Sequence, residues 1–140
     1  MRCEDIMKRN VAYVSPVDTA QHAALKMRQA NVGFLPVCDA DHHVIGTLTD
    51  RDLAMRLVAE GRGAEAKIAD VMTYEAVTCR PADDLHRAEQ IMSTHRKSRI
   101  LCVDEHGSLV GVISLSDVAQ YEDSDRAGRI MRSVTEREAF

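Results

Sequence analysis

Two hydroxyl–acid pairs are the residues best suited to chemistry in this sequence. Thr49 precedes Asp52 by three positions, and Ser114 precedes Asp117 by the same interval. Each pair follows an apolar run with strand character and opens a segment with helical periodicity, which puts the hydroxyl at the N-cap and the acid at the third helical position. One interpretation is a capping box, in which both side chains satisfy backbone donors and the cap contributes about 1 kcal/mol.

The same pairs also suit a nucleotide. An ionised carboxylate is an acceptor with two oxygens, which matches the adjacent 2′ and 3′ hydroxyls of a ribose. A hydroxyl at the start of a helix lies beside free N–H groups and the positive end of the helix dipole, and both favour a phosphate. The cap and the phosphate-plus-sugar site therefore stand as alternatives.

The elements that must position these pairs occur twice in the chain. A constant shift of 65 residues, with no gap, pairs Met7 with Met72 and Gly46 with Gly111. A repeat of this kind predicts two similar units. Each copy shows the order strand, helix, strand, strand, helix. We expect strands at 11–14, 34–38 and 44–49 with helices from about 18 and 52, then strands at 76–79, 99–103 and 109–114 with helices from about 83 and 116.

The sequence units predict the domain organisation. Residues 1–63 form the first copy with its entry segment, 64–121 the second copy, and 122–140 a helical tail, together one module. The tail places Ile130, Met131 and Val134 on one side of an amphipathic helix, which either packs on the module or serves as a dimer contact.

Two further segments carry a family resemblance. Leu35–Asp39 (LPVCD), Gly46 and Thr49–Asp52 (TDRD) resemble the signature of the cystathionine β-synthase (CBS) motif, and the second copy repeats it as ILCVD, Gly111 and SLSD. The resemblance extends to about Tyr121. It implies a Bateman module of the α/β (α+β) class: tandem CBS motifs, two β-α-β-β-α units packed with pseudo-twofold symmetry around two clefts, plus a C-terminal helix. It also implies disc-shaped dimers.

The resemblance assigns roles to individual residues. In CBS pairs the acid holds the ribose and the hydroxyl lies near the phosphates, while the base lies against strands of the other motif. The Asp117 cleft, with Ser114, is then lined by Val11, Ala12, Val32, Gly33, Phe34 and Pro36; the Asp52 cleft, with Thr49, is lined by Val77, Thr78, Ser98, Arg99, Ile100 and Leu101.

The Asp52 cleft departs from the family pattern, because Leu101 replaces the usual proline. Arg99 and Arg51 are candidates for phosphate contacts there, since a guanidinium matches phosphate oxygens. Gly33 and Pro36 leave more room for a flat base, so we expect the Asp117 cleft to bind the ligand more reliably.

Composition narrows the partners. The 18 basic and 22 acidic residues are spread along the chain, which argues against nucleic acid. The chain has no apolar run of about 20 residues and no secretory signal at its start, so we expect a cytoplasmic protein without a membrane span. The four cysteines show no metal-binding spacing and are expected to be reduced; Cys3 is the one expected to be reactive, and Cys38 and Cys102 are expected in the core.

No metal site is expected, because Asp41, His42 and His43 fit a solvated turn better than a metal site. No nucleophile has an adjacent base, so we predict a protein that is not an enzyme and needs no cofactor. The predicted function is a regulatory module that binds AMP, ADP or ATP, with NAD or S-adenosylmethionine as further candidates.

The alternative is a ligand-free dimerisation or protein-interaction scaffold, and a metal or thiol sensor is a third and weaker candidate. We expect a homodimer built through the small-residue helix faces around Ala23 and Ala88, and an effector protein that reads the signal.

Overall fold

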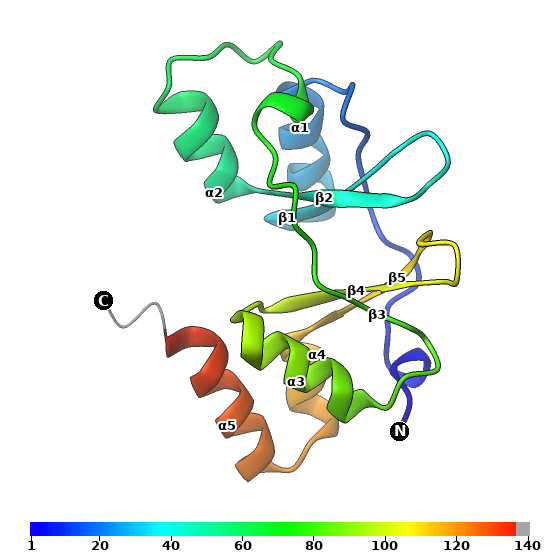
Figure 1. Ribbon diagram of the computed structural model, residues 1–140. Helices are drawn as coiled ribbons and strands as arrows, with labels where there is room; N and C mark the ends of the chain where they lie inside the picture. The colour runs from blue at the N-terminus through cyan, green and yellow to red at the C-terminus, as the bar shows by residue number, and fades with distance from the viewer. Residues whose placement is uncertain (137–140) are drawn as a thin grey trace. The chain divides into compact units, whose positions relative to one another are not determined.

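The chain folds into two compact units. In the computed structural model, which describes residues 1–136, one unit contains Ala12–Ala76, and the other combines Met1–Val11 with the chain from Val77 onward (Figure 1). The last four residues, including Arg137 of the expected tail helix, lie outside the described residues. The two units are described separately.

The unit formed by residues 12–76 contains the first hydroxyl–acid pair. Its strands β1 and β2 are antiparallel, and their inner side chains form a core with Val14, Ile68 and Val71, all at most 1 % exposed. The elements are α1 (Ala20–Ala30), β1 (Phe34–Cys38), β2 (Val44–Thr49), α2 (Asp50–Asp52), the π-helical turn η2 (Leu53–Val58) and the 3-10 turn η3 (Ile68–Asp70).

The other unit repeats this arrangement and adds a helix. Strand β4 lies between β3, to which it is parallel, and β5, to which it is antiparallel. The elements are the 3-10 turn η1 (Cys3–Asp5), β3 (Thr78–Cys79), α3 (Leu85–His95), β4 (Arg99–Val103), β5 (Leu109–Ser114), α4 (Leu115–Tyr121) and α5 (Ser124–Thr135).

The C-terminal helix expected from the sequence is present as α5, which packs against α3 (Figure 1). Ile130 and Val134 are buried there, because they face the core of the unit. Met131, expected on the same side, is 47 % exposed. One residue along an α-helix rotates a side chain by about 100°, so Met131 points away from the buried stripe that contains Ile130.

Helix ends follow the sequence signals. Thr19 caps α1 and Asp84 caps α3, each by accepting a hydrogen bond from a backbone N–H in the first turn. Asn31 and Arg96, which the repeat makes equivalent, end these helices in the left-handed conformation, with φ of 53° and 54°. The four long strands also have the expected bounds.

The strand expected at 11–14 is wrong as a regular element, and Pro36 explains why. In the second copy, the N–H of Leu101 donates to the carbonyl of Val77 at 3.1 Å, and β3 forms beside β4. Pro36 occupies the position equivalent to Leu101 and has no N–H to donate. The first copy therefore keeps a single parallel bridge, between Val14 and Val37.

The segment preceding each copy packs in the unit that contains the other copy. Lys8 pairs with Val112 on β5, and its repeat equivalent Thr73 pairs with Thr47 on β2, each through two backbone hydrogen bonds of 2.9 Å. The glycine beside each contact is required by this close approach. A Cβ on Gly111 would lie 2.6 Å from the sulfur of Met7.

The helix faces assigned to dimer contacts are occupied within each unit. Ala23 and Met27 of α1 are buried in the core of one unit, and Ala88 and Met92 of α3 in the core of the other. These buried side chains are not available to a partner, whereas Ala24 on α1 is exposed, so a homodimer through these helices stays a prediction.

The cysteines are free thiols and all four are buried, which confirms the core positions of Cys38 and Cys102. Cys3, the thiol expected to be reactive, is instead folded into the core by η1 with 0 % exposure. A hydrogen bond with Cys79 and burial raise the pKa of Cys3. Burial also raises the pKa of Cys38 to about 11, so neither Cys3 nor Cys38 has thiolate character at neutral pH.

Candidate functional site

Both hydroxyl–acid pairs form complete capping boxes. The backbone N–H of Asp52 donates to Thr49 Oγ1 at 3.1 Å, and that of Thr49 donates to Asp52 Oδ2 at 3.0 Å. In the second copy the corresponding distances between Ser114 and Asp117 are 3.1 and 2.9 Å. The capping box, one of the two interpretations of these motifs, is thus present in both copies.

The cap engages only one oxygen of the Asp117 carboxylate. Oδ2 accepts the backbone N–H of Ser114, whereas Oδ1 lies 3.4 Å from the ammonium of Lys8. The Asp117 side chain is 11 % exposed and that of Lys8 69 %, so the ion pair lies at the edge of the unit. Because a carboxylate oxygen has two lone pairs, Oδ1 keeps acceptor capacity after pairing with Lys8. Capping and ligand binding are therefore compatible here.

Asp52 has more protein partners than Asp117. The hydroxyl of Thr73 donates to its Oδ1 at 3.2 Å and lies 3.4 Å from Oδ2, and Arg56 Nε is 3.9 Å from Oδ1. Lys8 and Thr73 are equivalent in the repeat, because each follows the methionine that opens its copy. In each case this residue contacts the acid of a hydroxyl–acid pair. Sequence reasoning missed both residues, although the shift of 65 placed them at the same position.

The helix start beside Thr49 does not offer the free donors assumed for a phosphate. The N–H of Asp50 donates to the carbonyl of Gly33 at 2.9 Å, and that of Arg51 donates to Asp50 Oδ1 at 2.9 Å. The Asp50 carboxylate also adds a negative charge there. In the second copy the residue equivalent to Asp50 is Leu115, whose N–H donates to the Ser98 carbonyl but whose side chain adds no charge. An anion is therefore less favoured at the first copy than at the second.

The predicted ligand residues are distributed over both units. The structure brings Arg99 and Ser114 together as paired residues of β4 and β5, which places their side chains on the same face of one sheet. Arg51 is exposed beside the first acid.

The lining of each predicted cleft combines residues of the two units, so both clefts stay predictions. Unit 12–76 contributes Ala12, Val32, Gly33, Phe34, Pro36, Thr49, Arg51 and Asp52; the other contributes Val11, Val77, Thr78, Ser98, Arg99, Ile100, Ser114 and Asp117.

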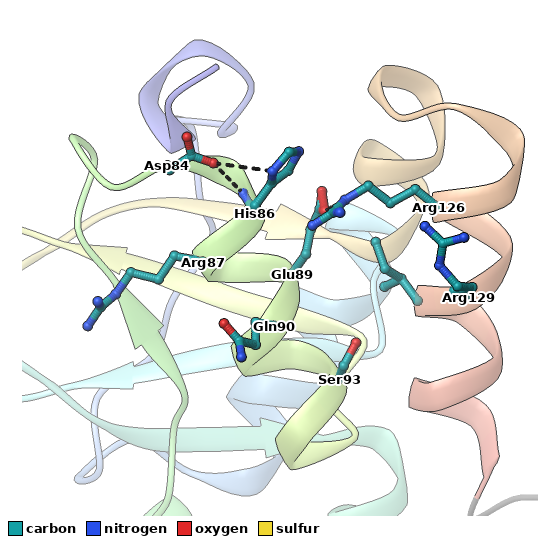
Figure 2. Close-up of a pocket in the computed structure, with 9 residues that line it drawn as sticks. Asp84, His86, Arg87, Glu89, Gln90, Ser93, Arg126 and Arg129 are labelled. Carbon is teal, nitrogen blue, oxygen red and sulfur yellow. Dashed lines mark hydrogen bonds and ion pairs between the residues drawn. The ribbon is translucent and has the colours of Figure 1, made fainter.

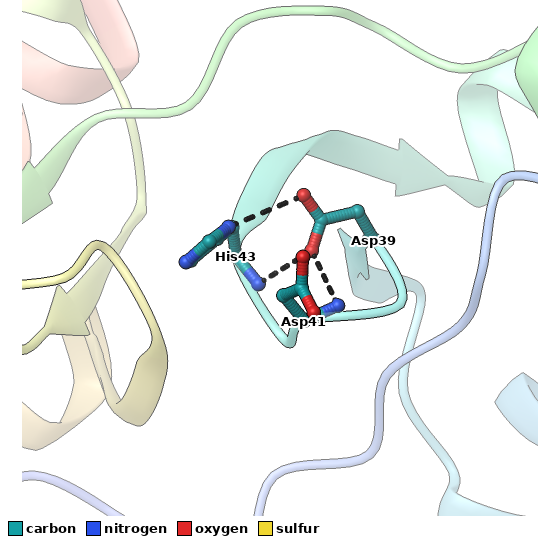
Figure 3. Close-up of side chains that lie close together, drawn as sticks. All are labelled: Asp39, Asp41 and His43. Atoms are coloured by element: carbon teal, nitrogen blue, oxygen red, sulfur yellow. Dashed lines mark hydrogen bonds and ion pairs between the residues drawn. The ribbon is translucent and has the colours of Figure 1, made fainter.

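The histidine turn is organised by backbone contacts. Asp39 Oδ1 accepts the N–H groups of Asp41 at 3.0 Å and of His43 at 2.9 Å, and His43 Nδ1 lies 3.3 Å from Asp39 Oδ2 (Figure 3). These backbone hydrogen bonds lower the pKa of Asp39. Asp104 makes the same two bonds in the second copy, where His43 is replaced by Ser108. The geometry is therefore that of a turn organised by backbone hydrogen bonds, and the expectation that it binds no metal stays a prediction.

Membrane insertion receives no support from the helices. Within residues 1–136, none combines the length and the apolar character needed to cross a bilayer.

Comparison with known proteins gives consistent results. The chain matches the CBS domain family twice, over residues 3–59 and 68–124. It is 38 % identical over 133 residues to the CBS domain-containing protein YhcV of Bacillus subtilis, covering 94 % of each chain. It is 30 % identical over 118 residues to Hypoxic response protein 1 of Mycobacterium tuberculosis, covering 84 % of this chain and 82 % of that protein.

Solved structures share the fold. A crystal structure of Hypoxic Response Protein I with two coordinated zinc ions has a TM-score of 0.78 at 28 % identity and covers 88 % of this chain and 100 % of its own. The CBS domain protein PAE2072 from Pyrobaculum aerophilum, complexed with AMP, has a TM-score of 0.78 at 20 % identity and covers 94 % of this chain and 98 % of its own. The two matched ranges each contain one hydroxyl–acid pair, and the chain belongs to the CBS domain family.

Proposed function

We propose that this protein is a regulatory module that binds an adenosine-containing ligand between its two CBS motifs, with Asp117 as the principal ribose acceptor. The observation that carries the proposal is that the two oxygens of the Asp117 carboxylate have different roles. One oxygen caps α4, and the other retains acceptor capacity at the edge of the unit. A ribose hydroxyl donating to that oxygen forms a charge-assisted hydrogen bond.

The surroundings of Asp117 also suit a phosphate. Lys8 supplies one positive charge 3.4 Å from the acid. Arg99 remains part of the proposed lining of the Asp52 cleft, where it could contact a phosphate. AMP, ADP and ATP combine a ribose with phosphates and are the favoured ligands. NAD and S-adenosylmethionine share the adenosine part and are further candidates. The ligand in PAE2072, AMP, is of this class.

The first copy is proposed as the weaker site. Asp52 already accepts the hydroxyl of Thr73, and Asp50 places a second carboxylate at the start of the same helix. Both features oppose an incoming phosphate and ribose. The proposed cleft linings are those given by the family resemblance, and the proposed role is regulatory without catalysis, in a cytoplasmic homodimer that signals to an effector protein.

Calorimetric titration of AMP and ATP tests the site. Asp117→Ala removes the acceptor, and losing a charge-assisted hydrogen bond costs about 1.5–3 kcal/mol, roughly ten- to hundredfold in affinity. Asp117→Asn keeps an oxygen for the cap and the side-chain volume but loses the charge, so we expect weaker binding by about tenfold with little change in stability.

Asp52→Asn is the matched variant in the first copy, and we expect it to change affinity less than Asp117→Asn. If both Asp117 variants remain folded and bind AMP and ATP as tightly as the parent, the acid serves only as a cap. That result would support the scaffold alternative, in which the module dimerises or binds a protein without a nucleotide.

A further inference from the structure

One buried acid in the unit that contains the second copy has a carboxylate oxygen without a hydrogen-bond partner among the described residues. Glu89 on α3 is 1 % exposed, and within residues 1–136 its Oε2 is a buried side-chain oxygen without a hydrogen-bond partner. Such an atom carries a desolvation cost unless something binds it. The CBS signature residues do not include this group, which lies on α3 and contacts Arg126 of α5.

Two further ligand-type side chains lie close to the Glu89 carboxylate. His86 lies one turn earlier on α3, and Glu122 lies between α4 and α5. One ligand atom from each of His86, Glu89 and Glu122 lies within 4.8 Å of the other two. His86 Nε2 and Glu122 Oε1 are 3.3 Å apart. Ligands bound to zinc at about 2.0–2.1 Å are about 3.3–3.4 Å apart along a tetrahedral edge, so this pair already has the required separation.

Arg126 holds the two carboxylates by their other oxygens. Its Nε donates to Glu89 Oε1 at 2.7 Å, and Figure 2 shows these two side chains side by side. The same Nε lies 3.7 Å from Glu122 Oε2. Glu89 Oε2 and Glu122 Oε1 are thus the oxygens left for a ligand. On the other side, Asp84 Oδ1 lies 3.8 Å from His86 Nδ1, on the opposite side of the ring from Nε2. A carboxylate behind a histidine and hydrogen bonds behind ligating carboxylates are typical supports of a metal site.

We propose that His86, Glu89 and Glu122 bind a divalent transition-metal cation of the zinc type, with Arg126 and Asp84 as positioning residues. An open hollow of about 630 Å³ is lined by His86, Glu89 and Arg126 among others, which gives the cation a path from solvent and leaves room for water as the remaining ligand. Two carboxylates and an imidazole supply the hard and borderline donors that such a cation accepts.

The site is specific to the second copy. The shift of 65 residues places Gln21, Ala24 and Leu57 at the equivalent positions of the first copy, and none of them is a metal ligand of this kind. The proposal does not depend on nucleotide binding, because none of its residues belongs to the predicted clefts.

A competing explanation for the unpartnered oxygen is a proton. Burial and the neighbouring Glu122 carboxylate raise the pKa of Glu89 to about 7, while Arg126 acts in the opposite direction. A protonated Glu89 can donate to Glu122 and satisfy both oxygens without a metal. The metal explanation predicts that the protein binds zinc at Glu89, whereas the proton explanation predicts that it does not.

Calorimetric titration of zinc chloride into the full chain, freed of metal by a chelator and then dialysed at pH 7.5, separates them. We expect one zinc ion per chain, and at least a tenfold loss of affinity in both Glu89→Gln and His86→Asn. Glu89→Gln keeps the acceptor for Arg126 and the volume of the side chain, so the variant is expected to fold. His43→Asn, in the turn of Figure 3, is the matched control and should bind zinc as the parent does.

Cobalt substitution identifies the ligand type. A site of nitrogen and oxygen ligands gives cobalt absorption without the intense near-ultraviolet bands of thiolate ligands, which distinguishes it from the buried cysteines. The proposal is overturned if the parent binds no zinc, if folded Glu89→Gln binds it equally well, or if His43→Asn abolishes binding. The first of these outcomes would assign the Glu89 oxygen to a proton shared with Glu122.

Discussion

Replacing Gly111 by alanine tests the packing of the entry segment on β5. The added Cβ would lie 2.6 Å from Met7 Sδ, 2.9 Å from Met7 Cγ and 3.1 Å from the carbonyl oxygen of Lys8. The Met7 side chain can turn aside, but the Lys8 carbonyl accepts the N–H of Val112 at 2.9 Å and cannot move without weakening that bond. The substitution must therefore displace the segment.

The structure sets the size of the effect. Overpacking a close contact costs about 1–3 kcal/mol, and the flexible thioether of Met7 favours the middle of that range. If the segment came off completely, the buried side chains of Cys3, Ile6 and Met7 would be exposed. At about 1.5–3 kcal/mol for a fully buried large apolar side chain, detachment would cost about 5 kcal/mol. We therefore expect Gly111→Ala to lower the free energy of unfolding by about 2 kcal/mol.

Urea unfolding followed by circular dichroism measures this change, since the chain contains no tryptophan for fluorescence. Gly128→Ala is the control. Gly128 lies within α5 and a Cβ there meets nothing within 4 Å, so alanine should stabilise the protein by about 0.5–1 kcal/mol through helix propensity. Equal or greater stability of Gly111→Ala than of the parent would refute the packing argument.

Three further outcomes follow from the structure. A hydrogen bond with Cys102, together with burial, raises the pKa of Cys79 to about 12, so a thiol reagent should label the native protein slowly and all four cysteines rapidly in denaturant. Leu101→Pro should destabilise the protein by at least about 3 kcal/mol in urea unfolding, because it removes both the N–H that donates to Val77 and a buried leucine side chain. Backbone donors lower the pKa of Asp104, so its stabilisation is present above the unfolded pKa and lost as pH falls through the lower folded value. Asp104→Asn should reduce the stability difference between neutral and acidic pH in urea titrations.

Much of the fold could be read from the sequence because the repeat and the strand patterns agree. The runs from Phe34 to Cys38 and from Leu109 to Ser114 carry apolar residues bounded by turns, and they fold with the expected bounds. The strand before α1 could not be judged from its own residues. Its pairing requires a backbone N–H at position 36, more than twenty positions later, where proline has none. The strand propensity of residues 11–14 carries no information about the donors of the strand they must pair with.

The candidate site was only partly predictable, since the motif gives the residue types but not their partners. The spacing of Ser114 and Asp117 predicted the cap correctly. That Lys8 reaches Asp117 depends on which sheet the entry segment joins, and a repeat alignment shows equivalence without showing contact. The cluster at Glu89 was missed for a similar reason. His86 and Glu89 share a helix face, but their burial depends on the docking of α5.

The pairing of each entry segment with the sheet of the other copy determines which pieces of the chain can be separated. Cutting after Gly63 leaves the fragment 1–63 without the residues around Thr73 that complete β2, and with residues 3–8 detached from β5. The stretch 12–76 is instead a continuous segment with all of its own backbone pairings. A fragment for separate expression should therefore be bounded near residues 12 and 76, and not at the border between the two sequence repeats.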